Sequence, residues 1–367
     1  MNKLTYAKVG DNYNSKDPIL NKVLTVAQKT NKNLVYKGYK ELPFSRGESA
    51  FIWDQGDCYM ASVLECLGTK SLVADEMRKI TGKTYYDIIA YDTVATFIND
   101  LTTVGANPLV VNAYWALGDN NWLKDKVRTS DFLRGWELAC NDAGAVWGGG
   151  ETPTLKGIIR KGTVDLAGSA VGIIKPKKRL ICENKLKVGD RILLLKSNGL
   201  NANGLSLARA VAQKAKKGYG SVISNRIMFG EAILQKTNIY AQLIQKLLKH
   251  NCDIHYIVNL TGHGIRKLMR ANYQKYCYIL EKVVEPLPIF EFIQKQTGLT
   301  DYEMYETFNM GMDYALFLPE NQVSKAEKIV EESGHKSILA GYVSKGNRSV
   351  NIISKSITYR SESYSIK

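Results

Sequence analysis

The sequence predicts a mixed α/β chain of the α+β class that folds into two domains. Strand-like apolar runs alternate with segments of helical periodicity along the whole chain, which is typical of this class. At roughly 150 residues per domain, 367 residues correspond to about two domains. Residues 175–179, a proline within a basic cluster, divide the chain into near-equal halves. We therefore expect domains over residues 1–176 and 177–367.

The first half contains three predicted helices and three predicted strands. Apolar residues recur at helical spacing over 18–29, 86–104 and 131–143. Gly105 and Gly144 follow the second and third of these segments, where a glycine commonly ends a helix. Apolar runs predict strands over 59–64, 109–115 and 164–174. Residues 40–57 are polar and are predicted to be irregular.

The second half continues the alternation and ends in a strand-rich segment. Apolar runs predict strands over 190–195, 254–258, 276–284 and 314–318. Helical patterns lie between and after them, over 205–216, 239–249, 265–270, 288–296 and 323–332.

Composition excludes several classes of protein. The chain is 45% hydrophobic and 23% charged, as in ordinary globular proteins. No apolar run approaches the roughly 18 residues that span a bilayer, and the first residues lack the apolar block of a signal peptide. We therefore expect a cytoplasmic protein without a membrane partner. The six cysteines form no C-x-x-C pair, so neither a disulfide framework nor a metal knuckle is expected.

The formal net charge is +15, from 50 Lys and Arg against 35 Asp and Glu. These basic residues are spread along the chain, and no known nucleic-acid-binding module is present, so we expect no nucleic-acid partner. A basic excess also helps to attract phosphorylated small molecules.

Four glycine-containing turns are candidate ligand loops, over 67–70, 149–152, 198–204 and 261–264. Glycine lets the backbone approach a ligand, and free N–H groups at a helix start can bind phosphate. Lys70 adds a positive charge beside the first turn. Neither the P-loop nor the G-x-G-x-x-G pattern is present, so a bound nucleotide would use another cradle.

Carboxylates near these turns are candidate metal ligands. On the predicted helix 86–104, Asp92 and Asn99 point about 20° apart, and Asp100 lies within about 80° of Asp92. With Glu65 and Glu151 beside glycine turns, the set suits magnesium, which prefers carboxylate and phosphate oxygens. An exposed polar stripe on the helix remains the alternative.

Short strings occur in a fixed order along nearly the whole chain. They are L-T-Y-A at 4–7, D-T-V-A at 92–95, N-D at 99–100, G-A-N-P-L at 105–109, G-G-E-T at 149–152, D-L-A-G at 165–168, N-G at 203–204, L-T-G at 260–262, and E-M-Y with T-F-N-M-G within 303–311. This ordered set resembles the aminoimidazole ribonucleotide synthetase family, also called phosphoribosylformylglycinamidine cyclo-ligase. That family is part of a larger group of ATP-using enzymes.

The resemblance implies a fold and an activity. The N-terminal domain would be a strand-rich dimerisation domain that forms a homodimer, and the C-terminal domain a sheet with helices that closes the cleft. The enzyme would use ATP and Mg²⁺ to cyclise formylglycinamidine ribonucleotide to aminoimidazole ribonucleotide, in purine biosynthesis, through phosphorylation of the amide oxygen.

The resemblance also implies roles for individual residues. Metal ligands would be Glu65, Asp92, Asp100 and Glu151. Cofactor-binding residues would be Gly68, Thr69, Lys70, Asn99, Gly149, Gly150, Thr152, Thr261 and Gly262. Catalytic residues would be Lys70, Asn201 and Asn203.

The chain departs from the family pattern at several of these positions. Glu65 stands for an aspartate, and Cys66 and Leu67 follow it where the pattern is D-G-V-G-T-K. Asn201 stands for the histidine of S-G-x-H-S-N-G. Asn259 and His263 replace a histidine before L-T-G and a glycine after it. The string F-N-x-G-x-G-M ends Gly311-Met312-Asp313.

These departures leave two alternatives open. One is another ATP-dependent enzyme of the larger group with a different phosphoryl acceptor, and the other is a non-catalytic nucleotide-binding dimer. Arg46, in the segment 43–49 that replaces the family's glycine-rich lid, is a further candidate phosphate ligand, with a surface loop residue as the alternative.

Overall fold

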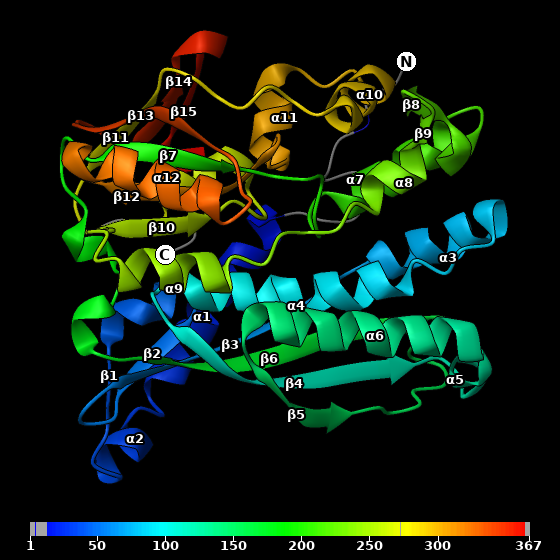
Figure 1. Ribbon diagram of the computed structural model, residues 1–367, viewed down its shortest axis with the longest axis horizontal. Helices are drawn as coiled ribbons and strands as arrows, with labels where there is room; N and C mark the ends of the chain where they lie inside the picture. Colours follow the sequence, from blue (N-terminus) through cyan, green and yellow to red (C-terminus); the bar gives the residue numbers. More distant parts are fainter. Residues whose placement is uncertain (1–3, 5–12, 272, 364–367) are drawn as a thin grey trace.

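The computed structural model describes Leu4, residues 13–271 and residues 273–363 (Figure 1). Its strands form two large sheets and one small hairpin, and helices pack on and between the sheets. The mixed α/β class predicted from the sequence is confirmed. No helix within these described ranges is long and apolar enough to cross a membrane.

The first sheet has six strands in the order β1-β2-β3-β6-β4-β5. Their bounds are β1 Lys40–Glu41, β2 Phe51–Asp54, β3 Tyr59–Cys66, β6 Val164–Ile174, β4 Asn107–Leu117 and β5 Val146–Glu151. All neighbours are antiparallel except β4 and β5, which are parallel. Helices α4 (Tyr86–Thr102) and α6 (Lys126–Ala143) cover one face (Figure 1).

The second sheet has seven strands in the order β10-β12-β7-β13-β11-β14-β15. Their bounds are β10 Tyr256–Asn259, β12 Met312–Leu318, β7 Arg191–Lys196, β13 Ser337–Lys345, β11 Tyr276–Leu280, β14 Ser349–Ile352 and β15 Ile357–Arg360. Its helices are α7 Leu205–Lys214, α8 Phe229–Ile233, α9 Ala241–Lys249, α10 Pro288–Thr297, α11 Asp301–Thr307 and α12 Val323–Glu332. Strands β8 (Val222–Ser224) and β9 (Ile227–Met228) form the hairpin.

The larger of two buried apolar clusters is shared by the two sheets, and the smaller lies between the second sheet and helices α9 and α12. A single cluster of buried apolar side chains runs from Ile52 in β2 to Tyr359 in β15. Helices α4 and α9 lie between the sheets, so that the first half of the chain is packed directly against the second (Figure 1).

The predicted elements are present, with ends that differ by a few residues. The N-terminal helix is α1 (Tyr13–Gln28), followed by the short α2 (Lys32–Tyr36). The segment predicted as helix over 265–270 is the 3₁₀ helix η6 (Gly264–Arg270). Several elements were missed, among them β2, inside a stretch predicted to be irregular, and α3 (Lys70–Thr81), which begins at the end of the first glycine turn. The short elements α2, β1, β8, β9, α8 and α11 were not predicted either. The short helices α5 (Asn121–Lys124) and η2 (Pro43–Gly47) connect larger elements.

The predicted turn over 149–152 was wrong. Gly149 and Gly150 belong to β5, where they pair with Asn112 and Ala113 of β4. Glycine is required at 150 because a Cβ there would lie 2.2 Å from the Ala113 carbonyl oxygen. The glycines therefore allow close strand pairing rather than a phosphate loop.

Candidate active site

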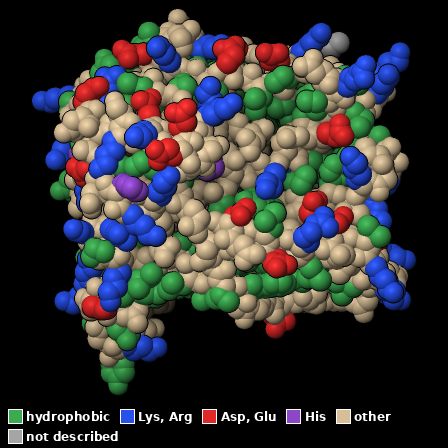
Figure 2. All heavy atoms as spheres, in the orientation of Figure 1, with side chains coloured by type: hydrophobic (Ala, Val, Ile, Leu, Met, Phe, Trp, Pro, Cys, Tyr) green, Lys and Arg blue, Asp and Glu red, His purple; other side chains and the backbone are tan. Residues whose placement is uncertain are grey.

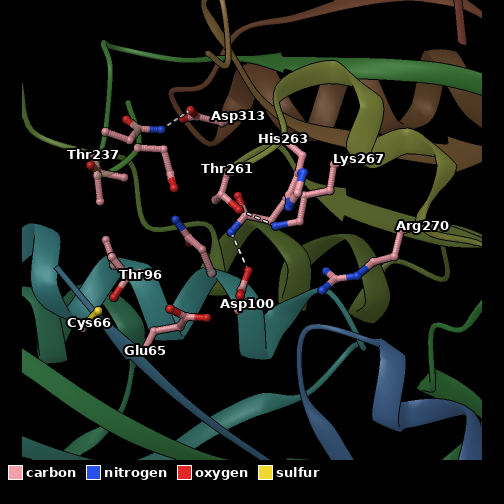
Figure 3. A pocket seen from close by; sticks show the side chains of 17 residues that line it. Glu65, Cys66, Thr96, Asp100, Thr237, Thr261, His263, Lys267, Arg270 and Asp313 are labelled. Atoms are coloured by element: carbon pink, nitrogen blue, oxygen red, sulfur yellow. Dashed lines mark hydrogen bonds between the residues drawn. The ribbon is translucent and has the colours of Figure 1, made fainter. Parts of the chain in front are cut away.

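A polar cavity of about 260 Å³ opens where α4 of the first half faces loops of the second sheet (Figure 3). The first half contributes the end of β3 and one face of α4. The second half contributes the turn after β7, the loop after α8, the end of β10, η6 and β12. The lining residues are Glu65, Cys66, Ala95, Thr96, Asn99, Asp100, Asn201, Ala202, Asn203, Thr237, Asn259, Thr261, Gly262, His263, Lys267, Arg270 and Asp313.

Two carboxylates converge on one side of this cavity. Glu65 comes from β3 and Asp100 from α4. Protein surrounding the Glu65 carboxyl raises its pKa to about 7, and the nearby charge of Asp100 acts in the same direction. Asp100 is held by the Asn259 side chain, whose Nδ2 donates to Oδ1 at 2.7 Å. A cation placed between the two carboxylates would relieve their repulsion.

Basic side chains from η6 lie on another side. Lys267 and Arg270 are three residues apart, which in a 3₁₀ helix places them on one face. Lys267 is buried and its ammonium donates to the Thr261 hydroxyl. Burial lowers the pKa of Lys267 to about 8, whereas the charge of Asp100 opposes that shift. This arrangement suits an anionic group in the cavity.

Arg270 also ties the segment before β2 to the cavity. Its Nε donates to the Gly47 carbonyl at 3.1 Å, and its guanidinium donates to Ser49. Arg46, in contrast, does not line the cavity. Its guanidinium donates to both oxygens of the Glu41 carboxylate, so this candidate phosphate ligand is already paired within the protein.

The remaining side of the cavity has no cationic side chain among its lining residues. Asp313, on β12, is buried and accepts hydrogen bonds from Asn201 at 2.6 Å and from the Tyr240 hydroxyl at 2.8 Å. Burial raises the pKa of Asp313, although these donors act against the shift. Figure 3 shows Asp313 and Thr237 away from Lys267 and Arg270.

Lys70 and Asp92 lie outside the cavity. Both side chains are fully buried and form an ion pair with each other. Lys70 also donates to the Gln235 carbonyl at 3.1 Å, and Asp92 accepts from the Thr237 backbone N–H at 2.8 Å. The pair therefore attaches the loop after α8 to the first half of the chain. In this arrangement neither group is placed to contact phosphate or a metal ion.

Asn99 continues the same attachment while lining the cavity. Its Nδ2 donates to the Asn238 carbonyl at 2.8 Å, and its Oδ1 accepts from the Tyr240 N–H at 3.0 Å. Lys70, Asp92 and Asn99, which suggested a nucleotide and metal site in the sequence, thus hold residues 235–240 in place.

The structure brings together only part of the predicted site. Glu65, Asn99, Asp100, Asn201, Asn203, Thr261 and Gly262 line the cavity, whereas Gly68, Thr69, Lys70, Asp92, Gly149, Gly150, Glu151 and Thr152 do not. Glu151 is exposed at the edge strand β5. Within the described residues, no three His, Cys, Asp or Glu side chains converge as a metal site. Of the four predicted metal ligands, only Glu65 and Asp100 line the cavity, and a magnesium ion at this place would need phosphate oxygens to complete its shell.

Sequence reasoning missed Lys267, Arg270 and Asp313 as cavity residues. A signal existed for each. The two basic residues follow a glycine turn at a spacing of three, and Asp313 is an acid within an otherwise apolar strand, where a charge needs partners. His263 lines the cavity in a left-handed conformation with φ of 70°, which is uncommon for histidine.

Each half of the chain matches a domain model of known proteins. The model "AIR synthase related protein, N-terminal domain" matches residues 47–174, and "AIR synthase related protein, C-terminal domain" matches residues 187–353. The phosphoribosylformylglycinamidine cyclo-ligase of Methanosarcina barkeri is 32% identical over 314 residues, covering 83% of this chain and 89% of that protein. The protein of the same name from Methanococcus maripaludis is 32% identical over 308 residues, covering 84% and 83%.

Solved structures share the fold at lower identity. The HypE–HypF complex gives a TM-score of 0.61 at 14% identity, covering 86% of this chain and 94% of that chain. Thiamine-monophosphate kinase from Stenotrophomonas maltophilia gives 0.57 at 12% identity, covering 83% and 88%. These similarities show a common architecture.

Proposed function

This chain belongs to the family of AIR synthase related proteins, and from that membership we propose that it is an ATP-dependent phosphoribosylformylglycinamidine cyclo-ligase. The observation that carries the proposal is the 32% identity to cyclo-ligases over most of both chains. The resemblance inferred from the short strings is thereby confirmed.

The cavity suits the proposed reaction. ATP would phosphorylate the amide oxygen of formylglycinamidine ribonucleotide, and a nitrogen of the same molecule would then displace phosphate and close the imidazole ring. Because ring closure is intramolecular, correct positioning of the reacting groups can supply most of the reduction in the activation barrier. A cavity with acidic, basic and neutral sides can orient a phosphorylated substrate beside the phosphate of ATP.

Phosphate would be held by Lys267 and by backbone N–H groups of the turn that contains Thr261 and Gly262. Among the lining residues that the structure describes, Lys267 is the one lysine, and it reaches the cavity from η6. Asn203 would contact the second substrate. For Lys70 and Asp92 we propose a structural role, because their charges are satisfied within the buried pair.

Magnesium would be held by Glu65 and Asp100 together with ATP phosphates. The convergence of two carboxylates, with the raised pKa of Glu65, supports this assignment. The ion would neutralise phosphate charge during transfer.

We further propose that the protein is a cytoplasmic homodimer without nucleic-acid or membrane partners. Helices α4 and α6 lie on one side of the first sheet, and no described helix lies over the other side of β3, β4 and β6 (Figure 1). That uncovered face carries apolar side chains, including Leu64, which is 74% exposed, and Tyr114. Lys and Arg side chains are scattered among acidic ones over the face seen in Figure 2, without a continuous basic patch.

The proposal is tested by supplying ATP, Mg²⁺ and formylglycinamidine ribonucleotide, and measuring both ADP release and aminoimidazole ribonucleotide. We expect equal amounts of the two products. ADP release without ring formation would indicate a different acceptor, and nucleotide binding with neither product would indicate a non-catalytic protein.

A further inference from the structure

Two departures from the family pattern, 112 residues apart in sequence, contact each other in the cavity wall. Asn201 stands where the pattern S-G-x-H-S-N-G has histidine, and Asp313 stands where F-N-x-G-x-G-M has its second glycine. The Asn201 Nδ2 donates to the Asp313 Oδ1 at 2.6 Å. One departure supplies the donor and the other the acceptor.

Asp313 fixes the orientation of the Asn201 amide. When ionised, Asp313 can only accept hydrogen bonds, so it selects the NH₂ group of the amide and excludes the reverse orientation. The other carboxylate oxygen accepts from Tyr240, and Asn309 donates more weakly to Oδ1 at 3.4 Å. Asp313 is therefore held from several sides and cannot turn away from Asn201.

In this orientation the Asn201 NH₂ group is bonded to Asp313, and the amide oxygen of Asn201 can accept a hydrogen bond from a ligand. Asn201 Oδ1 is buried and has no hydrogen-bond partner within the described part of the chain. A buried acceptor without a partner costs about 1–3 kcal/mol, a cost that a ligand N–H or O–H would remove. The hydroxyl of Thr237, also on the cavity wall, is likewise buried and unpaired there.

The charges around the cavity indicate which part of a ligand lies here. Asp313 and Thr237 lie away from Lys267 and Arg270 (Figure 3). A buried carboxylate repels phosphate, whereas amide and hydroxyl oxygens accept hydrogen bonds from uncharged groups.

We propose that Asp313 is a positioning residue that locks Asn201, and that the pair receives the uncharged, hydrogen-bond-donating part of the ribonucleotide substrate. This proposal rests on the proposed function, since it assigns one end of the same site. Asn201 touches the substrate, and Asp313 acts through it. The two departures thus act as one hydrogen-bonded unit.

The test is a double-mutant cycle with Asn201→His, Asp313→Gly and the double variant, which restores the family pattern. We expect each single variant to raise KM for formylglycinamidine ribonucleotide about tenfold and to leave KM for ATP within about twofold. The Asp313 carboxylate favours the protonated form of a histidine at 201, which has no acceptor for the substrate, so the double variant should be less impaired than Asn201→His alone. Strictly additive effects would overturn the coupling.

Asp313→Asn is the companion variant if Asp313→Gly fails to fold. It keeps the shape of the side chain but allows the Asn201 amide to reverse, so the same rise in KM is expected. Asp190→Asn is the matched control, because Asp190 is a buried carboxylate that accepts from His255 outside the cavity. It should lower the thermal midpoint without changing either KM.

The two proposals fail in different ways. A parent protein that binds ATP and formylglycinamidine ribonucleotide without converting them overturns the proposed function alone. In that case calorimetric titration with the ribonucleotide replaces kinetics: about tenfold weaker binding to Asp313→Asn supports the pair, and equal binding overturns it. A parent that does not bind the ribonucleotide overturns both.

Discussion

At the scale of single residues, burial decides the role of a charged side chain more than its motif does. Lys70 belongs to a string that resembles an ATP loop, yet its ammonium is enclosed with Asp92. The string could be read from the sequence. The partner could not, because it lies 22 residues away on α4 and its position depends on how α3 packs.

Lys70→Met should therefore destabilise the protein. Removing one partner of a buried pair leaves the other charge uncompensated, which costs about 3–5 kcal/mol. Urea denaturation measures the loss. Lys79→Met is the control on the same helix, because Lys79 pairs with Glu76 at the surface and should change stability by less than about 0.5 kcal/mol. If Lys70→Met left the stability unchanged and raised KM for ATP, Lys70 would be a phosphate ligand and not a structural residue.

His263 occupies a backbone conformation that favours glycine. At φ of 70°, a side chain with a Cβ is strained. His263→Gly and His263→Ala both remove the imidazole, but only glycine removes the strain. The glycine variant should be the more stable of the two by about 1 kcal/mol in chemical denaturation. Equal stabilities would mean that the turn relaxes freely.

The raised pKa of Glu65 predicts pH dependence. The folded-state pKa of Glu65, about 7, lies above the ordinary glutamate value of 4.5, so this group stabilises the fold fully below pH 4.5 and less as pH rises through 7. Magnesium needs the ionised carboxylate, so binding of the Mg²⁺–ATP complex should strengthen about tenfold between pH 6 and 8. Calorimetry on Glu65→Gln isolates the part that comes from ATP itself. The same slope in both proteins would exclude Glu65 as a ligand.

At the scale of elements, the sequence predicted strands and long helices well because burial on one face leaves a regular apolar pattern. Strand β6, for example, has the bounds expected from its apolar run. The loop over 235–240 has no such pattern. Its conformation is fixed by side chains of α3 and α4, so it could be located only in three dimensions.

Asn99→Ala should loosen this loop. The variant removes hydrogen bonds to the Asn238 carbonyl and the Tyr240 N–H, and each buried group left unpaired costs about 1–3 kcal/mol. Hydrogen–deuterium exchange should become faster over residues 235–240. Asn141→Ala, at an exposed position of α6, is the control. Unchanged exchange in the loop would show that Lys70 and Asp92 hold it without Asn99.

At the scale of the whole molecule, the uncovered face of the first sheet predicts self-association. Leu64→Asp places a charge on that face and should convert a dimer to a monomer, as measured by light scattering at micromolar concentration. Ile353→Asp changes an exposed apolar residue of the second half and should leave the mass unchanged. A parent protein that is already monomeric would contradict the proposed dimer.

The loop over 235–240 also bears on how the chain folds. It belongs to the second half by sequence, yet its backbone is held by α3 and α4, and the apolar core is continuous across both sheets. A fragment ending near residue 176 would expose the inner face of α4, and the complementary fragment would lack the partners of this loop. The two halves are thus expected to unfold in a single cooperative transition, and to regain structure when expressed as separate chains only if both are present.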